Sequence, residues 1–470
     1  MEIKNKVDLS LNREDFYKKY KKNKTASIYT LGCKVNQYES NAIANLLENE
    51  GYEIVDFESE ADVYIINTCT VTGISARKSR QMIRKAVTLK RKQNGEAVIV
   101  AAGCYPQTAP QEISAIKDVD IITGTKDKNK IIDYIKNYSK CNKKQINEVD
   151  DITKAKNFEE LHVDNYKDRT RAYVKIQDGC NQYCSYCIIP YARGPIRSRR
   201  PEDVISEAKK LADNGFLEIE LIGIHLASYG KDLGYSSLVD IVRRVHEIDG
   251  IKRIRLSSLE PSIITPEFID KIKGLNKLCP HYHISLQSGC DDTLKRMNRK
   301  YTTLDYKAAV QLLRKSIDDV SITTDVMVGF PGETDLEFEQ TYKFAEEIGF
   351  SKMHVFKFSP RKGTPAYLNE SQVPAEIKEE RSKRLIRLSE ECALKFNKSF
   401  EGRVFPVLFE QPSDYPGFYE GLTPNYIRVL YREERDLKGQ ILNVVIKEAH
   451  KDFAIAETAG PIKDSLTTKR

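Results

Sequence analysis

Short apolar runs alternate with amphipathic segments over residues 25–137. The runs have the length of buried strands, whereas the segments between them place apolar residues at helical spacing. Strands that alternate with helices favour a parallel, doubly wound sheet. The basic segment before residue 25 is predicted to be frayed. The predicted strands are Ser27–Leu31, Val63–Ile66, Ala97–Ala101 and Val119–Ile122, and the predicted helices are Glu39–Asn49, Ile74–Lys92 and Lys128–Lys136.

A second alternation begins at Arg171 and predicts a partial (β/α)6 barrel. The chemistry of such a barrel sits at the carboxyl ends of its strands. The predicted strands are Ala172–Gln177, Leu217–Ile222, Arg253–Ser257, His283–Leu286, Ile322–Val328 and His354–Phe358, and the helices are Pro201–Asp213, Leu238–Ile248, Pro266–Ile272, Leu304–Ser316 and Asp335–Ile348.

These patterns predict an α/β chain with a terminal all-β domain. Residues 25–137 form the parallel-sheet domain, and the polar segment 138–168 is predicted to be a linker. The partial barrel occupies 169–399 and ends in a long charged helix. Residues 400–460 contain short alternating runs, such as RVFPVLFE and ILNVVIK, between Gly and Pro turns. This pattern is typical of a small β-barrel.

Composition narrows the function. The 470 residues, 40% hydrophobic and 30% charged, exclude a wholly disordered chain. No apolar run approaches the ~18 residues of a membrane span, and the charged N-terminus has no signal core. We therefore expect a cytoplasmic protein without membrane association. In that reducing compartment, ten cysteines favour metal or thiol chemistry over disulfides. The net charge of +7 weakly favours a polyanionic partner.

Cys180, Cys184 and Cys187 form a Cys-x3-Cys-x2-Cys motif directly after the first predicted barrel strand. Three thiolates on one loop can hold a metal centre. A structural zinc ion takes four ligands, and no fourth cysteine or histidine lies close by in sequence. The spacing favours a 4Fe–4S cluster with one open iron. A zinc site completed from elsewhere in the chain is the alternative.

Cys33, Cys69 and Cys104 each follow the end of a predicted strand. Carboxyl ends of parallel strands share one edge, where ligands bind, so these cysteines are predicted to meet there. The alternative is three buried cysteines without function, but their turn-type neighbours Gly32 and Gly103 oppose it. The remaining cysteines have no ligand-like partners and are interpreted as structural: Cys141, Cys279, Cys290 and Cys392.

Two basic groups favour contact with a nucleic acid. Residues 77–92 hold eight lysines and arginines and no acid. A second group, residues 193–200, follows the later cysteine motif. A phosphate backbone that approaches a metal site would explain both groups, whereas two solvated faces are the plain alternative. The phosphate contacts are predicted for Arg77, Arg80, Arg84, Arg197 and Arg199.

The later cysteine motif and the ends of the following strands resemble the radical S-adenosylmethionine superfamily. Its signature is Cys-x3-Cys-x-aromatic-Cys, with Tyr186 at the aromatic position, and further matches are Gly223–His225, Ser257–Pro261 and Gln287–Gly289. The resemblance implies that the open iron binds S-adenosylmethionine, and that one electron then releases a 5′-deoxyadenosyl radical. The residues that it implies in cofactor binding are Tyr186, Gly223, His225, Ser257, Glu260, Gln287 and Asp325.

Four segments resemble the methylthiotransferase family: Gly32–Ser40, Asn67–Val71, Gly103-Cys104 and Arg193–Arg199. The likeness covers about residues 25–458. It implies a second 4Fe–4S cluster, which carries sulfur, on Cys33, Cys69 and Cys104, and a terminal barrel of the RNA-binding TRAM type. It also implies tRNA, an electron donor of flavodoxin or ferredoxin type, and a sulfur donor as partners.

Lys34–Glu39 resembles the family members that act on N6-threonylcarbamoyladenosine 37 of tRNA. The implied reaction adds a methylthio group to C2 of that nucleoside. Isopentenyladenosine 37 and a ribosomal protein are alternative substrates, and a zinc-stabilised, non-catalytic RNA-binding protein is the alternative of another class. The TRAM-like domain departs from expectation, with 7 basic and 10 acidic residues between Glu401 and Glu457. Its predicted RNA contact is a local patch of Arg428, Tyr426 and Tyr431.

Overall fold

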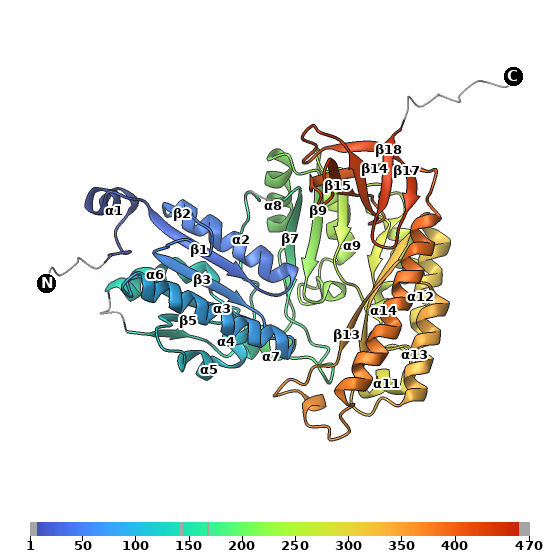
Figure 1. The fold of residues 1–470 in the computed structure, drawn as a ribbon, viewed down its shortest axis with the longest axis horizontal. Coiled ribbons are helices and arrows are strands. Elements are labelled where there is room, and N and C mark those ends of the chain that lie inside the picture. Colours follow the sequence, from blue (N-terminus) through green and yellow to red (C-terminus); the bar gives the residue numbers. More distant parts are fainter. Residues whose placement is uncertain (1–6, 141–143, 167–168, 460–470) are drawn as a thin grey trace.

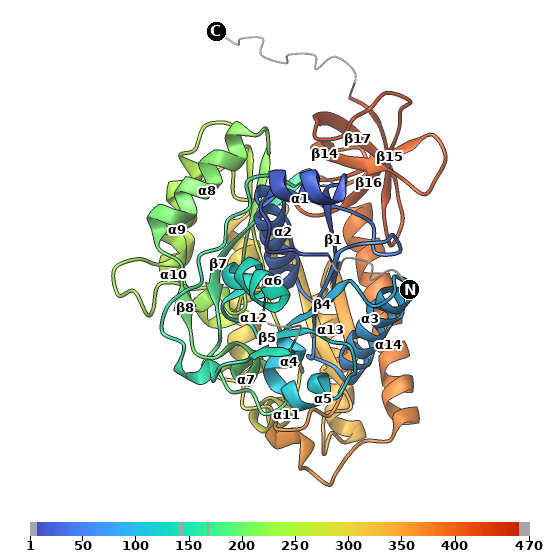
Figure 2. The same cartoon turned by 90° about the vertical axis from the view of Figure 1, so that its left-hand side faces the viewer.

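The structure is a computed structural model that describes residues 7–140, 144–166 and 169–459. An N-terminal parallel-sheet domain is followed by a central partial barrel and a small C-terminal barrel (Figure 1). The N-terminal domain lies beside the central barrel, and the C-terminal barrel lies at one end of it, as the turned view also shows (Figure 2). No helix among the described residues is long and apolar enough to cross a membrane.

The N-terminal sheet has six parallel strands in the order β2-β1-β3-β4-β5-β6. Helices cover both faces of the sheet. Side chains alternate between the two faces along each strand, so Ile65 of β3 packs in the apolar core on one face and Ile66 in the core on the other. The strands are β1 (Lys24–Thr30), β2 (Tyr52–Ile54), β3 (Val63–Thr68), β4 (Val98–Gly103), β5 (Ile121–Thr123) and β6 (Ile146–Glu148), and the helices are α1 (Arg13–Tyr20), α2 (Lys34–Asn49), α3 (Gly73–Lys92), α4 (Cys104–Thr108), α5 (Pro110–Ser114) and α6 (Ile131–Lys140).

Two segments are more structured than the sequence predicts. The segment expected to be frayed contains α1, which Asn12 caps and whose Phe16 is buried in the core. The segment predicted to be a linker supplies β6, and its Leu161 and Val163 are buried in the core of the central barrel. These apolar residues are too isolated to show a period. Cys141 of this segment lies outside the described residues.

The central domain confirms the predicted partial barrel. Parallel β7, β9 and β10 connect through single bridges to parallel β11, β12 and β13, while β8 pairs antiparallel with β7. The strands are β7 (Arg171–Asp178), β8 (Arg197–Ser198), β9 (Glu218–Gly223), β10 (Arg253–Leu256), β11 (His281–His283), β12 (Ser321–Val328) and β13 (Lys352–Lys357); the helices are α7 (Ile189–Arg193), α8 (Pro201–Asp213), α9 (Leu238–His246), α10 (Pro266–Ile272), α11 (Asp291–Arg296), α12 (Thr303–Ser316), α13 (Asp335–Ile348) and α14 (Ala375–Lys398).

The C-terminal domain is a closed barrel in the order β14-β15-β16-β18-β17. Its core contains Phe405, Phe409 and Val429, which point inward from alternating strand positions. The sequence predicts four of these strands and misses β15, which contains a glycine and is only half buried. The strands are β14 (Val404–Pro412), β15 (Phe418–Leu422), β16 (Arg428–Arg432), β17 (Ile441–Ala449) and β18 (Ala454–Thr458).

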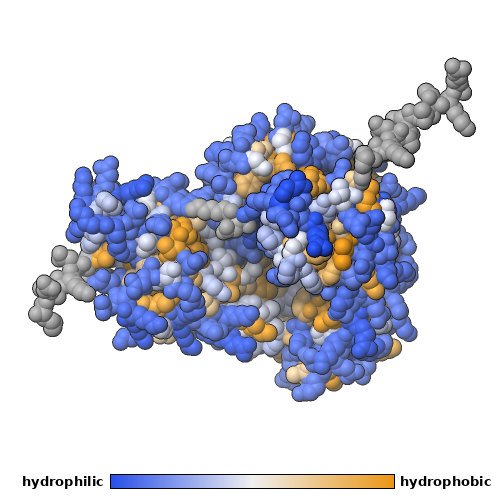
Figure 3. Space-filling model, turned by 45° about the horizontal axis from the view of Figure 1, so that its top comes forward, coloured by the Kyte–Doolittle hydropathy of each residue, from blue (hydrophilic) through white to orange (hydrophobic). Residues whose placement is uncertain are grey.

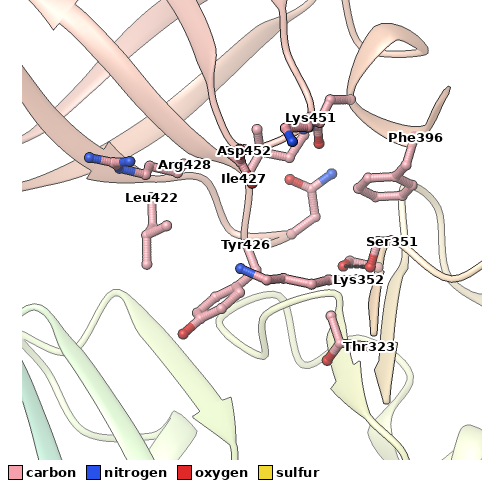
Figure 4. A pocket seen from close by; sticks show the side chains of 13 residues that line it. Thr323, Ser351, Lys352, Phe396, Leu422, Tyr426, Ile427, Arg428, Lys451 and Asp452 are labelled. Atoms are coloured by element: carbon pink, nitrogen blue, oxygen red, sulfur yellow. Dashed lines mark hydrogen bonds between the residues drawn. The ribbon is translucent and has the colours of Figure 1, made fainter. Parts of the chain in front are cut away.

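Tyr426 docks the C-terminal barrel on the strand starts of the central barrel. Its ring stacks on His281 at 4.3 Å between centroids, and the guanidinium of Arg255 lies 4.7 Å from the ring centroid. Arg253 donates to the carbonyl of Leu422 at 2.9 Å. A cavity of about 210 Å³ remains beside this contact, with Tyr426 pointing toward the central barrel (Figure 4). This docking face is therefore opposite the strand ends.

The predicted RNA patch of the C-terminal barrel is wrong for the same reason. Tyr426 is engaged in the docking, Tyr431 is buried in the barrel core, and Arg428 is paired with Glu420. Their side chains thus bind other parts of the chain instead of forming a free basic and aromatic surface.

Candidate active site

Cys33, Cys69 and Cys104 converge at the carboxyl edge of the N-terminal sheet. They follow β1, β3 and β4, which are neighbours in the sheet. Gly32 and Gly103 turn the chain sharply before two of them, with φ of +108° and +97°. A Cβ on Gly32 would lie 3.2 Å from the Sγ of Cys69. Glycine at position 32 therefore leaves room for the thiol of Cys69, and glycine at position 103 leaves room for Asn67 and the backbone of Thr68.

Two asparagines hold this edge together. The amide of Asn36 donates to the carbonyls of Leu31 and Thr68, at 2.7 and 2.9 Å, and so joins the ends of β1 and β3. Asn67 donates back to the carbonyl of Asn36 at 2.9 Å. Both amides are buried. The loops that carry Cys33 and Cys69 are thus fixed by side-chain hydrogen bonds.

The second triad, Cys180, Cys184 and Cys187, occupies the loop between β7 and α7. The backbone N–H of Cys180 donates to the carbonyl of Gly194 at 3.0 Å, and that of Cys187 to the carbonyl of Cys184 at 2.9 Å. Arg299 donates to the Sγ of Cys184 at 3.3 Å. The loop is thereby folded so that the three side chains share one region beside a buried cation.

Burial, with a smaller contribution from neighbouring thiols, raises the pKa of Cys180 to about 11 and those of Cys104 and Cys187 to about 12. These three free thiols therefore stay protonated. Such thiols are poor nucleophiles, because the reactive form is the thiolate. A metal centre stabilises the thiolate directly. The donor sets therefore fit metal ligation better than nucleophilic catalysis.

Ligand spacing separates a cluster from a single zinc ion. Ligand atoms of one tetrahedral zinc lie close together, since each is only ~2.0–2.3 Å from the metal. Among the described residues, the group of three whose ligand atoms all lie within 4.8 Å of one another is Cys290, Asp292 and Glu337, and neither triad meets this limit. Glu337 is itself paired with Arg296. Each triad therefore has at least one pair of sulfurs more than 4.8 Å apart, farther than two ligands of a single tetrahedral zinc ion lie, which disfavours the zinc alternative.

A polar group surrounds the second triad. His225 and Arg299 contact the two oxygens of Glu260, at 3.0 and 2.9 Å, and Gln182 donates to it at 3.2 Å. Burial raises the pKa of Glu260, but the hydrogen bond from His225 and the charge of Arg299 outweigh it and hold the pKa below its usual value. Glu260 therefore stays ionised and fixes three side chains from three loops.

The other predicted cofactor residues lie along the same strand ends, with one exception. Gly223 ends β9, and Tyr186 is packed edge-on against Phe330. Ser257 and Gln287 each place a buried side-chain oxygen without a partner in the described part of the chain. Unsatisfied buried oxygens are costly, so these two fit a site that a polar ligand completes.

Asp325 is the exception. It lies inside β12 instead of at its end, and its carboxylate is 3.2 Å from His283 of β11. Asp325 and His283 thus face the interior of the partial barrel, below the level of the cysteine loop. The sequence pattern places Asp325 within the predicted strand Ile322–Val328, but it could not reveal the contact with His283, which lies on a separate strand.

The two domains pack together through helices that adjoin the two triads. Helix α4, which begins at Cys104, packs against α7, which follows Cys187; both views place these helices side by side (Figures 1 and 2). Thr125 donates to the carbonyl of Ala192 at 2.6 Å. On the other side, Gly73 donates to Ser359 at 2.9 Å. The surface in Figure 3 is hollowed between the N-terminal domain and the barrels.

The basic residues divide into two kinds. Arg77 and Arg84 of α3 are exposed, and no carboxylate in the described ranges pairs with them. Arg80 is half-buried and donates to the hydroxyl of Tyr105. The prediction of phosphate contacts is wrong for Arg197 and Arg199, whose side chains are buried. Arg197 pairs with Asp178 and Arg199 with Glu160 and Glu207, so carboxylates already neutralise both.

Sequence reasoning missed several polar residues of the site. Arg299 and Arg361 come from segments without a motif, and Arg361 reaches across the domain interface to Thr70. Gln182 lies within the Cys180–Cys187 motif, but nothing in sequence links it to Glu260. Asn36 lies inside a motif, but its role depends on β3, which is distant in sequence. The role of these residues becomes apparent only in the structure, where they lie near the cysteine triads.

Comparison with known proteins agrees with this arrangement. Residues 174–345 match the model of the radical SAM superfamily, and residues 25–124 match that of uncharacterized protein family UPF0004. The radical S-adenosylmethionine methyltransferase TsrM of Kitasatospora setae has a similar fold, with a TM-score of 0.56 at 15% identity over 74% of this chain and 77% of that chain.

Relatives of greater identity extend over nearly the whole chain. Threonylcarbamoyladenosine tRNA methylthiotransferase MtaB of Bacillus subtilis (strain 168) is 44% identical, covering 94% of this chain and 98% of that protein. MtaB of Aquifex aeolicus (strain VF5) is 37% identical over 89% and 98%. tRNA-2-methylthio-N(6)-dimethylallyladenosine synthase of Clostridium novyi (strain NT) is 38% identical over 91% and 95%. The chain belongs to the methylthiotransferase family of the radical SAM superfamily.

Proposed function

We propose that this protein is a tRNA methylthiotransferase that adds a methylthio group to C2 of N6-threonylcarbamoyladenosine at position 37, beside the anticodon. The observation that carries the proposal is the packing of α4, which begins at Cys104, against α7, which follows Cys187, so that each domain brings a cysteine triad to their interface. Relatives at 44% and 37% identity over most of the chain bear the name of this activity. A cytoplasmic location, where tRNA is available, is part of the proposal.

Two 4Fe–4S clusters and S-adenosylmethionine fit the site. Cys180, Cys184 and Cys187 would hold the cluster that binds S-adenosylmethionine, and Cys33, Cys69 and Cys104 the second cluster. When bound, these groups supply the radical, the sulfur and the methyl group that an unreactive aromatic C–H requires. The wider spacing of the triads and their buried thiols support this assignment over zinc.

The chain's own residues would orient the cofactor. Glu260 ties His225, Gln182 and Arg299 into one rigid group beside the second triad. Gln287, with a left-handed φ of +66°, and Ser257 offer oxygens that lack a partner within the described residues. These groups are suited to the amino and hydroxyl groups of S-adenosylmethionine, since each accepts a hydrogen bond.

The partners follow from surface and chemistry. The exposed guanidinium groups of Arg77 and Arg84 on α3, which begins shortly after Cys69, suit phosphates of a tRNA. An electron donor of flavodoxin or ferredoxin type and a sulfur donor complete the proposal, because the reaction consumes an electron and a sulfur atom.

Mass spectrometry of tRNA nucleosides tests the function directly. A strain that lacks the gene should accumulate threonylcarbamoyladenosine without its methylthio derivative, and the wild-type gene should restore the derivative. The second candidate is dimethylallyladenosine, because relatives at 35–38% identity bear the name of its synthase. Loss of methylthio-dimethylallyladenosine instead would support that substrate, and no change in either nucleoside would refute both.

A further inference from the structure

One short segment, residues 193–195, connects the loop of the second triad with the helix that follows Cys33. The carbonyl of Gly194 accepts the backbone N–H of Cys180 at 3.0 Å. The next carbonyl, that of Pro195, lies so close to Gly179 that a Cβ there would be 1.9 Å from it. The backbone of residues 194–195 is therefore pressed against the loop of the second triad. The side chain of Arg193 extends to the N-terminal domain.

The guanidinium of Arg193 is completely buried between the domains. It donates to the Oδ1 of Asn36 at 2.6 Å, to the Oε1 of Glu39 at 2.8 Å and to the Oδ1 of Asp178 at 3.1 Å. Its relative exposure is 0%. Three acceptors from two domains match the planar fork of an arginine, which a lysine cannot reproduce.

Two of the acceptors lie directly beside a triad: Asn36 near the start of α2 and Asp178 at the end of β7. Asn36 donates to the carbonyls at the ends of β1 and β3, and its Oδ1 lies 3.9 Å from the Sγ of Cys33. Asp178 accepts the N–H of Gly179 at 2.8 Å, directly before Cys180. Arg193 is thus one hydrogen bond away from the backbone that carries each triad.

The buried network around Arg193 has an excess of positive charge. Glu39 and Asp178 are its two carboxylates, and four cations pair with them: Lys128, Lys175, Arg193 and Arg197. Even with Glu159 ionised near Lys128, a positive excess remains. Arg193 donates to the Oδ1 of Asn36, which itself lies 3.9 Å from the Sγ of Cys33. This contact places the positive excess beside the N-terminal triad.

We propose that Arg193 is a positioning residue that fixes the separation of the two triads and places positive charge beside the N-terminal one. The inference rests on the proposed function, in which both triads hold clusters. A positive charge stabilises the more negative, reduced form of a nearby cluster. Removal of that charge therefore lowers the reduction potential of the N-terminal cluster.

Four variants of the full-length, reconstituted protein test the proposal. Arg193→Gln removes the charge, Arg193→Lys keeps the charge but loses the fork, and Asn36→Ala removes the acceptor. Arg199→Lys is the matched control, since Arg199 is equally buried but pairs with Glu160 and Glu207, away from both triads. Iron content, EPR-monitored reduction of each cluster, and methylthiolated nucleoside formed per 5′-deoxyadenosine are measured.

Arg193→Gln should lower the midpoint potential of the N-terminal cluster more than that of the other cluster. Arg193→Lys and Asn36→Ala should retain iron but reduce nucleoside per 5′-deoxyadenosine on the order of 10²-fold, as misplacement of reacting groups does. The double variant Arg193→Lys/Asn36→Ala should form no less nucleoside per 5′-deoxyadenosine than the more impaired single variant, because both substitutions break the same hydrogen bond. If Arg193→Gln does not fold, the results for Arg193→Lys and Asn36→Ala decide whether Arg193 is a positioning residue.

Equal behaviour of Arg193→Lys and Arg199→Lys in all three measurements would overturn the proposal and leave Arg193 a plain structural residue. A wild-type protein that forms no methylthiolated nucleoside would instead refute the proposed function. The potential of the N-terminal cluster in Arg193→Gln would then still decide the role of the charge.

Discussion

The exposed arginines of α3 provide a quantitative test of tRNA binding. Arg77 and Arg84 lack a carboxylate partner in the described ranges, whereas Arg91 on the same helix donates to Asp118 at 2.6 and 2.8 Å. The double variant Arg77→Gln/Arg84→Gln should lose two phosphate contacts. Arg91→Gln is the matched control, because it removes the same charge from a group that is already neutralised.

The magnitude follows from counterion release. Each phosphate contact contributes about 0.7–0.9 to the slope of log K against log salt. Two lost contacts should therefore lower the slope by about 1.4–1.8, which corresponds to roughly 15- to 30-fold weaker binding at ~0.15 M salt. Arg91→Gln should stay close to wild type.

Fluorescence anisotropy with a labelled tRNA, titrated from about 0.05 to 0.2 M salt, measures both quantities. The loss should be the same for different tRNA sequences, since phosphates carry no sequence information. A wild-type slope in the double variant, or an equal loss in Arg91→Gln, would refute the assignment of α3 as the phosphate-binding helix.

Three further predictions concern the site and its supports. Replacing Cys180, Cys184 and Cys187 by alanine should halve the reconstituted iron in a colorimetric assay, and unchanged iron would refute the ligand assignment. Glu260→Gln leaves the buried Arg299 without its carboxylate, so the free energy of unfolding in a denaturant titration should fall by about 3–5 kcal/mol. Glu267→Gln, at an exposed pair with Lys271, is the control and should change it little. Burial, followed by the charge of Arg255, holds the pKa of His281 well below its ordinary 6.5. The neutral His281 side chain is therefore compatible with the folded state above the unfolded-state pKa, and the folded protein loses stability as pH falls below that pKa. Thermal unfolding should show this fall in melting temperature in wild type but not in His281→Gln.

The alternation of apolar and polar residues predicts those parts of the fold that depend on residues near one another in sequence. Cys33, Cys69 and Cys104 could be placed at one edge because strand order is constrained in a parallel sheet, and turn residues marked the strand ends. The partial barrel followed from the same alternation. The bounds of β11 and β5 shifted by a few residues, because short buried strands give little periodicity.

The fate of charged residues could not be predicted in this way. Arg199 and Arg84 look alike in sequence, but one is buried against Glu207 and the other is exposed. Glu207 lies on α8, and only the packing of that helix against β7 determines the pairing. For the same reason the sequence pattern places Arg193 in the basic group 193–200, although the partners of its side chain come from α2 and β7. Tertiary packing, not local composition, assigns each charge its partner.

Paired chromatography of 5′-deoxyadenosine and of digested tRNA nucleosides tests the central claim, that two clusters have separate roles. The triple alanine variant at Cys33, Cys69 and Cys104 should still form 5′-deoxyadenosine under reducing, anaerobic conditions but no methylthiolated nucleoside. The triple variant at Cys180, Cys184 and Cys187 should form neither. Methylthiolated nucleoside from the first variant would contradict the account, because those three cysteines would then be structural.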